Sequence, residues 1–159
     1  MTLSQNQSAQ SAVTPQSPSL VCQYPAAPAD AVIRWFSQRL QFETDCSDVQ
    51  SALSSGADDF VLLDVRGEAA YAKSHVPGAL NLPHRQITEA TLQALPAERL
   101  LVVYCAGPHC NGADQAALKI ARLGYPVKMM IGGLQGYQDE GFAVTEPTET
   151  ADKSLQCGC

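Results

Sequence analysis

Short apolar runs alternate with helix-like segments along most of the chain, and this alternation constrains the fold more than any other feature. The run at residues 99–105, "RLLVVYC", is the strongest strand candidate because β-branched and aromatic residues occupy its centre. A second buried strand is predicted at 59–65, "DFVLLDV", and shorter ones at 41–46, 78–83 and 126–133. Helical patterns fill the intervals. This order is typical of an α/β domain, so we expect a largely parallel sheet between helical layers.

We expect the domain to cover residues 27–144, with a segment of different composition on either side. Residues 1–26 carry no charged side chain and too few apolar groups to fold alone, which predicts a disordered polar lead. Residues 145–159 are expected to form a flexible tail, which ends in Cys157 and Cys159. The chain is therefore interpreted as one folded domain with two irregular ends.

The first element of the domain is predicted to be a helix at residues 30–41. Asp30 is a candidate N-cap, and Ile33, Phe36 and Leu40 follow at helical spacing. Arg34, Gln38 and Arg39 lie off that face. We therefore expect an amphipathic helix that packs its apolar face on the domain.

The balance of charge argues against two classes of partner. The chain has a formal net charge of −6 and a pI near 4.9, whereas proteins that bind nucleic acids or anionic membranes carry basic patches. No apolar run approaches the ~20 residues that a membrane-spanning helix needs. The start of the sequence lacks the basic and apolar regions of an export signal, so we expect a cytoplasmic location.

Cys105 stands where the strongest strand ends and a helical pattern, residues 112–123, is about to begin. Ligand sites in parallel sheets gather at the carboxyl ends of strands. Free backbone N–H groups and the positive end of a helix dipole stabilise an anion at such a turn, and the thiolate is the nucleophilic form of a cysteine. Cys105 is therefore a candidate nucleophile, with a buried structural cysteine as the alternative.

Four segments resemble, in order, the successive motifs of the rhodanese homology domain. They are "LLDVR", "HVPGALNLP", "VVYCAGPHCNGADQAALKIARLGY" and "IGGLQGYQDEGF". The resemblance extends from about Phe42 to Val144. It implies a rhodanese-like α/β fold with a five-stranded, mainly parallel sheet that is flanked by helices.

The resemblance also implies a reaction. In this family a cysteine takes sulfane sulfur from a donor, holds it as a persulfide and passes it to a thiophilic acceptor, and Cys105 matches that cysteine. The implied donor is of the thiosulfate or persulfide type, the implied acceptor is cyanide, a small thiol or a protein thiol, and neither metal nor organic cofactor is needed. The loop backbone is expected to hold the negative outer sulfur, through Ala106, Gly107, His109, Cys110 and Asn111.

The length of the loop separates two branches of this fold. A sulfurtransferase loop counts six residues from the cysteine, here Cys105 to Cys110, whereas phosphatase-type loops carry an arginine at the next position. Asn111 occupies that position, so a phosphate or arsenate dianion would lack its bidentate clamp. Phosphatase and arsenate reductase chemistry is therefore disfavoured. The sole basic loop residue, His109, either points to solvent or supplies the charge that related loops obtain from arginine or lysine.

The "DVR" motif and the second loop cysteine have supporting roles under this interpretation. Asp64 and Arg66 are expected to brace the loops around the site, with direct contact to the substrate as the alternative, and Glu68 is a candidate partner for Arg66. Cys110 either fills the base of the loop or acts as a resolving thiol, which would attack the Cys105 persulfide, release sulfide and leave a disulfide. That disulfide requires the two Cα atoms to lie within ~7 Å.

Two other classes of function remain as alternatives. A thiol-redox or sulfur-carrier module with little turnover would use Cys105, Cys110 and the terminal Cys-Gly-Cys, and it would bind a protein partner. A metallochaperone would use the terminal pair, although two cysteines form an incomplete metal site. Cys22 and Cys46 are interpreted as ordinary free thiols, Cys46 within a "DCSD" turn.

Overall fold

Five parallel strands form the centre of the computed structural model, which describes residues 18–147 of the chain. Every strand pairing in the sheet is parallel, so the predicted α/β fold with a five-stranded parallel sheet is confirmed. The two longest strands lie side by side within the sheet, where helices cover both faces. Across the sheet the order is β1 (Glu43–Thr44), β5 (Val127–Met130), β4 (Leu100–Tyr104), β2 (Phe60–Asp64) and β3 (Leu80–Asn81).

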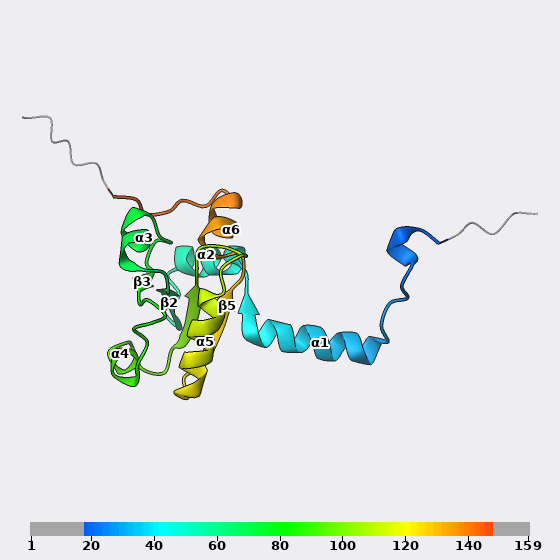
Figure 1. The fold of residues 1–159 in the computed structure, drawn as a ribbon, viewed down its shortest axis with the longest axis horizontal. Coiled ribbons are helices and arrows are strands. Elements are labelled where there is room, and N and C mark those ends of the chain that lie inside the picture. The colour runs from blue at the N-terminus through cyan, green and yellow to red at the C-terminus, as the bar shows by residue number, and fades with distance from the viewer. Residues whose placement is uncertain (1–17, 148–159) are drawn as a thin grey trace, which may run out of the picture.

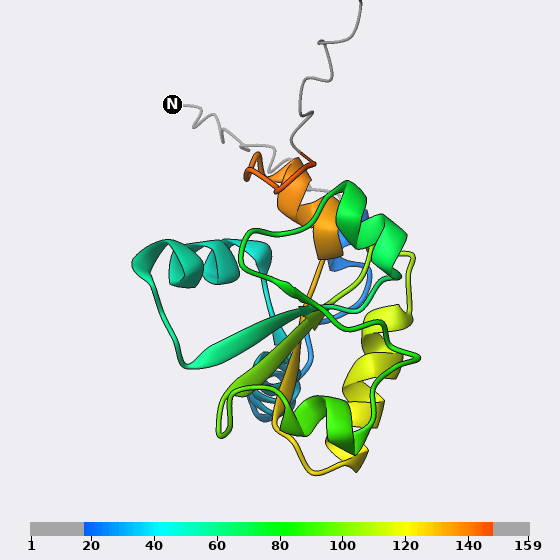
Figure 2. The ribbon, with the colours of Figure 1, turned by 90° about the vertical axis from the view of Figure 1, so that its left-hand side faces the viewer.

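Helices cover both faces of the sheet, as Figure 2 shows. One face packs against α2 (Cys46–Ser55) and α6 (Gly133–Asp139), and the other against α4 (Glu89–Gln93) and α5 (Gly112–Arg122). The short helix α3 (Glu68–Lys73) follows β2. The carboxyl ends of the parallel strands consequently meet at one edge, between these layers.

The side chains of β4 alternate between the two core layers. Leu101, Val103 and Cys105 lie in the layer beneath α4 and α5, whereas Val102 and Tyr104 lie in the layer beneath α2 and α6. This period of two is the pattern that a strand buried on both faces produces. It places Cys105 on the α5 side of the sheet, just beyond the last residue of β4.

Cys46 is the first residue of α2 and not part of a turn, which corrects the expectation from the sequence. The helix begins there because the Asp45 carboxylate accepts a hydrogen bond from the N–H of Asp48 at 2.7 Å. Only 1% of Cys46 is exposed, and its thiol donates to the carbonyl oxygen of Ile131 at 3.3 Å. Cys46 therefore joins α2 to the segment that follows β5.

The predicted N-terminal helix forms as α1 (Ala29–Phe42), but the expectation that it packs on the domain is wrong. Figure 1 shows α1 extending away from the sheet, and none of its residues is buried. Its chain passes from Phe42 directly into β1, without the turn that would fold the helix back. Contact with the sheet is confined to the last helical turns, where the Lys128 ammonium donates to the carbonyl oxygen of Leu40 at 2.9 Å. The apolar stripe of α1 is consequently exposed.

The two flanking segments fall partly outside the described residues. The described end of the predicted lead contains η1 (Leu20–Cys22), a single 3₁₀ turn with exposed side chains. At the other end, Thr145 and His75 exchange two backbone hydrogen bonds of 2.8 and 3.0 Å, one residue beyond the predicted domain boundary. Residues 1–17 and 148–159, including Cys157 and Cys159, lie outside the described part. No helix within residues 18–147 has both the length and the apolar character needed to cross a bilayer.

Candidate active site

The loop that begins at Cys105 connects the carboxyl end of β4 to the first turn of α5. Helix α6 holds it from one side, since the N–H groups of Leu134 and Gln135 donate to the carbonyl oxygens of Cys105 and Ala106 at 3.0 and 2.9 Å. This close approach requires glycine at position 133, where φ is +61° and an added Cβ would lie 2.6 Å from the Cys105 oxygen. The loop is therefore fixed by α6 as well as by β4.

Cys105 and Cys110 are joined by a disulfide in this structure. Their Cα atoms are 6.3 Å apart, within the range that a disulfide spans. The loop folds back through a hydrogen bond of 3.0 Å from the N–H of Cys110 to the carbonyl oxygen of Gly107. Cys105 is 6% exposed, whereas Cys110 is half-buried. The second loop cysteine therefore lies within bonding reach of the first.

Gly112 makes room for the two sulfur atoms. A Cβ at this first residue of α5 would lie 2.9 Å from Sγ of Cys105 and 3.3 Å from Sγ of Cys110. Any larger side chain would consequently displace at least one sulfur. The start of α5 is thus shaped around both cysteines.

A pocket of about 590 Å³, which we call the Cys105 pocket, opens beside the loop. Three of its lining side chains, Arg66, Arg85 and Lys119, are cationic, and no carboxylate is among the lining residues of this part of the structure. The complete lining comprises Val65, Arg66, Gly67, Ala70, His84, Arg85, Cys105, Ala106, Cys110, Asn111, Gly112, Gln115 and Lys119. The pocket therefore combines a candidate nucleophile with a positive surface.

Three of the basic residues at the pocket were not predicted from the sequence: His84, Arg85 and Lys119. His84 and Arg85 follow β3, and Lys119 lies on α5, where its ammonium donates to the carbonyl oxygen of His84 at 2.7 Å. The signal that would have found the first two is their position after the strand-like segment "GALNLP", because the carboxyl ends of parallel strands share an edge. Lys119 stands seven residues into a helical pattern, and the sequence contains no comparable signal for it.

Asp64 and Arg66 form a forked ion pair at the edge of the pocket. The Asp64 carboxylate is fully buried and accepts from Nε of Arg66 at 2.9 Å and from Nη2 at 2.5 Å. The same Nη2 donates to the carbonyl oxygen of Ser74 at 2.6 Å. Burial alone would lower the pKa of Arg66, but the hydrogen bond and charge of Asp64 raise it above its usual value. Glu68, the partner predicted from the sequence, accepts from Gln86 instead.

Tyr104 and Asn81 extend this bracing. The Tyr104 hydroxyl accepts a hydrogen bond of 3.0 Å from the N–H of Val76, and burial next to Asp64 raises the pKa of the phenol. The Asn81 amide donates to the carbonyl oxygens of Asp64 and Arg66, each at 3.0 Å. The ends of β2, β3 and β4 are therefore tied together beneath the pocket.

The remaining predicted loop residues divide into two groups. Ala106 and Asn111 line the Cys105 pocket, and Gly107 lines a smaller pocket of about 210 Å³ that borders the same two cysteines. His109 is exposed and lines neither pocket. Asn111 precedes α5 but makes no side-chain cap, and its Oδ1 accepts from Gln115 at 2.9 Å. The positive charge at the site thus comes from residues outside the loop.

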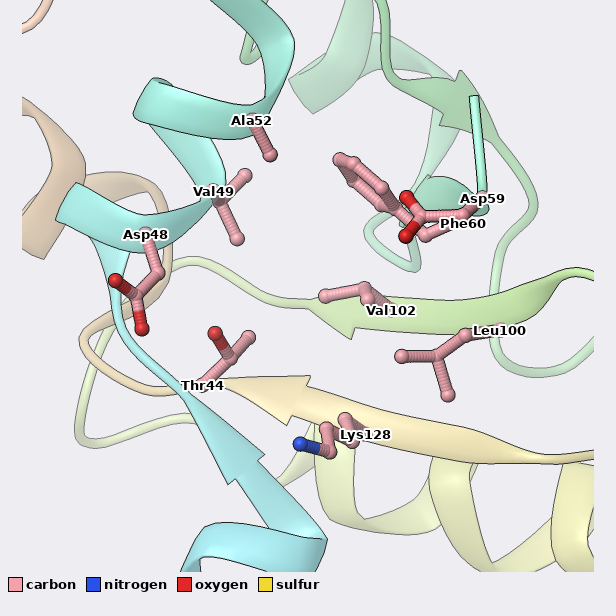
Figure 3. Close-up of a pocket in the computed structure, with 9 residues that line it drawn as sticks. All are labelled: Thr44, Asp48, Val49, Ala52, Asp59, Phe60, Leu100, Val102 and Lys128. Atoms are coloured by element: carbon pink, nitrogen blue, oxygen red, sulfur yellow. The ribbon is translucent and has the colours of Figure 1, made fainter. Parts of the chain in front are cut away.

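A separate pocket of about 230 Å³ lies between α2 and the sheet (Figure 3). Val49 and Ala52 of α2 face Phe60 and Val102 there, with Lys128 on β5 nearby. None of its lining residues borders the Cys105 pocket, and none is a cysteine or histidine. Among residues 18–147, no cluster of three or more histidine, cysteine, aspartate or glutamate side chains forms a metal-binding arrangement. The Cys105 pocket is therefore the candidate active site.

The chain is similar in sequence to curated proteins. The chain is 35% identical over 91 residues to the HTH-type transcriptional regulator Rv0324 of Mycobacterium tuberculosis, a match that covers 57% of this chain and 39% of the regulator. It is 31% identical over 108 residues to the thiosulfate sulfurtransferase GlpE of Pseudomonas entomophila, which covers 67% of this chain and 92% of GlpE. The chain thus spans about two fifths of the regulator and nearly all of GlpE.

Solved structures show the same arrangement of strands and helices. The BH2092 protein of Bacillus halodurans superimposes with a TM-score of 0.73 and 35% identity, over 75% of this chain and 87% of that one. The rhodanese-like domain of Alr3790 from Anabaena superimposes with a TM-score of 0.60 and 25% identity, over 74% and 86% of the two chains. The sequence model of the rhodanese-like domain family matches residues 45–140 of the chain, from the start of α2 to the end of α6. Because that match includes four of the five strands, both helical layers and the cysteine loop, the chain belongs to the rhodanese-like domain family.

Proposed function

We propose that the protein is a sulfurtransferase in which Cys105 takes sulfane sulfur from an anionic donor of the thiosulfate or persulfide type. The Cys105 thiolate attacks the outer sulfur of thiosulfate, and sulfite leaves with the bonding electron pair. An acceptor thiolate or cyanide then attacks the outer sulfur of the Cys105 persulfide and releases the thiolate. The relative GlpE, a thiosulfate sulfurtransferase by name, supports this class of reaction.

The observation that carries the proposal is the charge of the Cys105 pocket. Three cations and no carboxylate line it, although the whole chain has a net charge of −6. Asp64 neutralises Arg66, whereas Arg85 is exposed and forms no ion pair with any residue of 18–147. Arg85 and Lys119 are therefore available to attract a dianion such as thiosulfate to the thiol. They supply the charge that the loop itself lacks.

The loop backbone can hold the negative outer sulfur of a persulfide. Within the described chain, the N–H groups of Ala106, Gly107, His109 and Asn111 have no backbone carbonyl partner. Hydrogen bonds from such groups to an anion are stronger than those to a neutral acceptor, and the first turn of α5 adds its dipole. The chain's own residues thus account for anion binding without a metal or an organic cofactor.

The test is to find the transferred sulfur on Cys105. The protein is first reduced, because a disulfide-bonded Cys105 has no thiolate to attack a donor. After incubation with thiosulfate or glutathione persulfide and removal of the donor, mass spectrometry should show one added sulfur on the peptide that contains Cys105. The proposal fails if neither reduced wild-type protein nor its Cys110→Ser variant ever gains this mass, or if the Cys105→Ser variant gains it equally.

A second candidate function is thiol–disulfide exchange with a protein partner and little sulfur transfer, which the Cys105–Cys110 disulfide favours. It predicts that the oxidised protein exchanges its disulfide with a partner dithiol faster than the reduced protein accepts sulfur. Rapid turnover of thiosulfate together with slow exchange would exclude it. We expect either reaction to run in the cytoplasm, where small thiols keep most cysteines reduced.

A further inference from the structure

Cys110 borders both the Cys105 pocket and the smaller pocket on the other side of the loop. A cysteine that only filled the base of the loop would not have to lie within bonding distance of Cys105. In this structure Cys110 is bonded to it, with the two Cα atoms 6.3 Å apart and the loop closed by the hydrogen bond from Cys110 to Gly107. The position of Cys110 is therefore one from which its thiolate can react with Cys105.

The disulfide also identifies the atom that Cys110 reaches. Its Sγ contacts Sγ of Cys105, which is the inner sulfur of a Cys105 persulfide and not the outer one. External acceptors attack the outer sulfur. Attack on the inner sulfur has a different product, because the outer sulfur then becomes the leaving group.

Room for both sulfurs is built into the start of α5. Gly112 leaves space that a Cβ would fill at 2.9 Å from one sulfur and 3.3 Å from the other. The two pockets of about 590 and 210 Å³ both border Cys105, so an outer sulfur has space while Cys110 stays within reach. The loop can therefore accommodate the persulfide and the attacking thiol together.

We propose that Cys110 gives the protein a second activity, release of hydrogen sulfide by intramolecular attack on the Cys105 persulfide; this inference rests on the proposed sulfurtransferase function. The Cys110 thiolate forms a bond to Sγ of Cys105, and the bond from that Sγ to the outer sulfur breaks. The outer sulfur leaves as hydrosulfide with the bonding electron pair. It is reduced to sulfide while the Cys110 sulfur is oxidised to the disulfide level, which Sγ of Cys105 already has in the persulfide, so no external oxidant is needed.

The disulfide of the structure is then the end of one cycle, and a reductant begins the next. Two equivalents of a small thiol, or one dithiol, return Cys105 and Cys110 to thiols by exchange. Sulfide formation is therefore coupled to consumption of thiol, and the persulfide has two competing fates. An external acceptor that reaches the outer sulfur quickly receives it, and otherwise Cys110 expels it as sulfide.

The forward test measures sulfide from protein that carries a single sulfur. Cys157→Ser and Cys159→Ser are introduced first, so that the terminal thiols contribute nothing. Reduced protein is loaded with thiosulfate, freed of donor and kept without added thiol. We expect about one sulfide per loaded protein and a Cys105–Cys110 disulfide by peptide mass spectrometry. In the Cys110→Ser variant the sulfur should stay on Cys105, with sulfide release at least tenfold slower. Cys22→Ser, which removes an exposed thiol, is the matched control.

The reverse test does not depend on thiosulfate. Sulfide added to the oxidised protein should open the disulfide, and rapid alkylation should trap a persulfide on Cys105 and a thiol on Cys110. If neither route gives a persulfide on Cys105, or if the Cys110→Ser variant releases sulfide as fast as the wild type, the resolving role is overturned. A persulfide that forms from sulfide but never from thiosulfate would reject the proposed sulfurtransferase and leave the resolving role standing.

Discussion

Asp64 and Arg66 lie two residues apart at the carboxyl end of β2, and the Arg66 guanidinium covers both oxygens of a carboxylate that has no exposed surface. Arg66 also binds the Ser74 carbonyl, so a single side chain joins the end of β2 to the segment that follows α3. Removing one partner of such a pair leaves the other charge buried and uncompensated. This relationship determines the first prediction.

The Arg66→Ala variant should lose about 3–5 kcal/mol of unfolding free energy, because Asp64 then remains buried without its counter-ion. Denaturant unfolding monitored by circular dichroism measures the loss. Arg99→Ala is the matched control, since Arg99 pairs with the exposed Asp58 at 3.4 Å and should cost less than about 1 kcal/mol. Equal losses in the two variants would contradict a bracing role for Arg66.

Arg85 should determine the affinity for anionic donors. A solvent-exposed charge in a water-like dielectric contributes about 1 kcal/mol to the binding of an opposite charge, so Arg85→Ala should raise KM for thiosulfate about fivefold with little change in kcat. The difference should shrink as salt is added, because added ions screen exposed charges. Arg122→Ala removes an exposed cation that does not line the pocket, and KM should stay at the wild-type value in that variant.

Gly112→Ala should disturb both loop cysteines. The new methyl group would lie closer to the Cys105 sulfur than packed atoms allow and in tight contact with the Cys110 sulfur, so we expect a loss of about 1–3 kcal/mol and slower closure of the Cys105–Cys110 disulfide. Titration of free thiols during mild oxidation follows the closure. Gly67→Ala is the control at the other side of the pocket, where an added Cβ meets no atom within 4 Å. Wild-type closure in Gly112→Ala would show that the loop does not depend on this space.

Cys46 should make stability fall at alkaline pH. Burial, reinforced by the charges of Glu140 and Asp45, raises the pKa of its thiol from 9.0 to about 11. Between these values the folded chain holds a proton that the unfolded chain has released, so unfolding free energy declines as pH rises from about 9 to 11. The advantage of wild type over Cys46→Ala should therefore shrink by roughly 2–3 kcal/mol between pH 8 and pH 11. A difference between wild type and Cys46→Ala that stays constant with pH would contradict the burial of the thiol.

Trp35 reports on the position of α1 in solution, because it is the single tryptophan of the chain and is 66% exposed. Its fluorescence should be red-shifted in the native protein and should be quenched by acrylamide nearly as strongly as in denaturant. Blue-shifted, protected emission would mean that α1 is covered in solution. Measurement over a range of protein concentrations distinguishes association between copies from folding back within one chain.

The central strands could be predicted from the sequence because the apolar pattern that defines each strand lies within a single short segment. The apolar runs at β2 and β4 are long enough to predict burial on both faces, and the period of two then fixes the side on which Cys105 lies. The position of Asp64 and Arg66 follows from the same strand ends. These features need no knowledge of which segments meet in space.

The cationic pocket and the position of α1 could not be predicted in this way. Arg85 and Lys119 come from separate segments that meet because of the strand order, which no local pattern encodes. An amphipathic helix has the same spacing whether its apolar face packs on its own domain or remains exposed, so the pattern of residues 30–41 predicted the helix but not its place. To predict the disulfide, one would need the distance between the Cα atoms of two cysteines that are five positions apart in the sequence.

The hydrogen bonds from α6 to the cysteine loop affect the order in which the parts of the domain fold. Leu134 and Gln135 bind the carbonyls of Cys105 and Ala106 from almost the last element of the fold, so the loop cannot close until β5 and α6 have docked. We expect pulsed hydrogen exchange during refolding to protect the amides of β2 and β4 before those of Leu134 and Gln135. A nascent chain that is still emerging from the ribosome would then expose an unformed, unreactive Cys105, and reactivity would arise only as synthesis of the domain is completed.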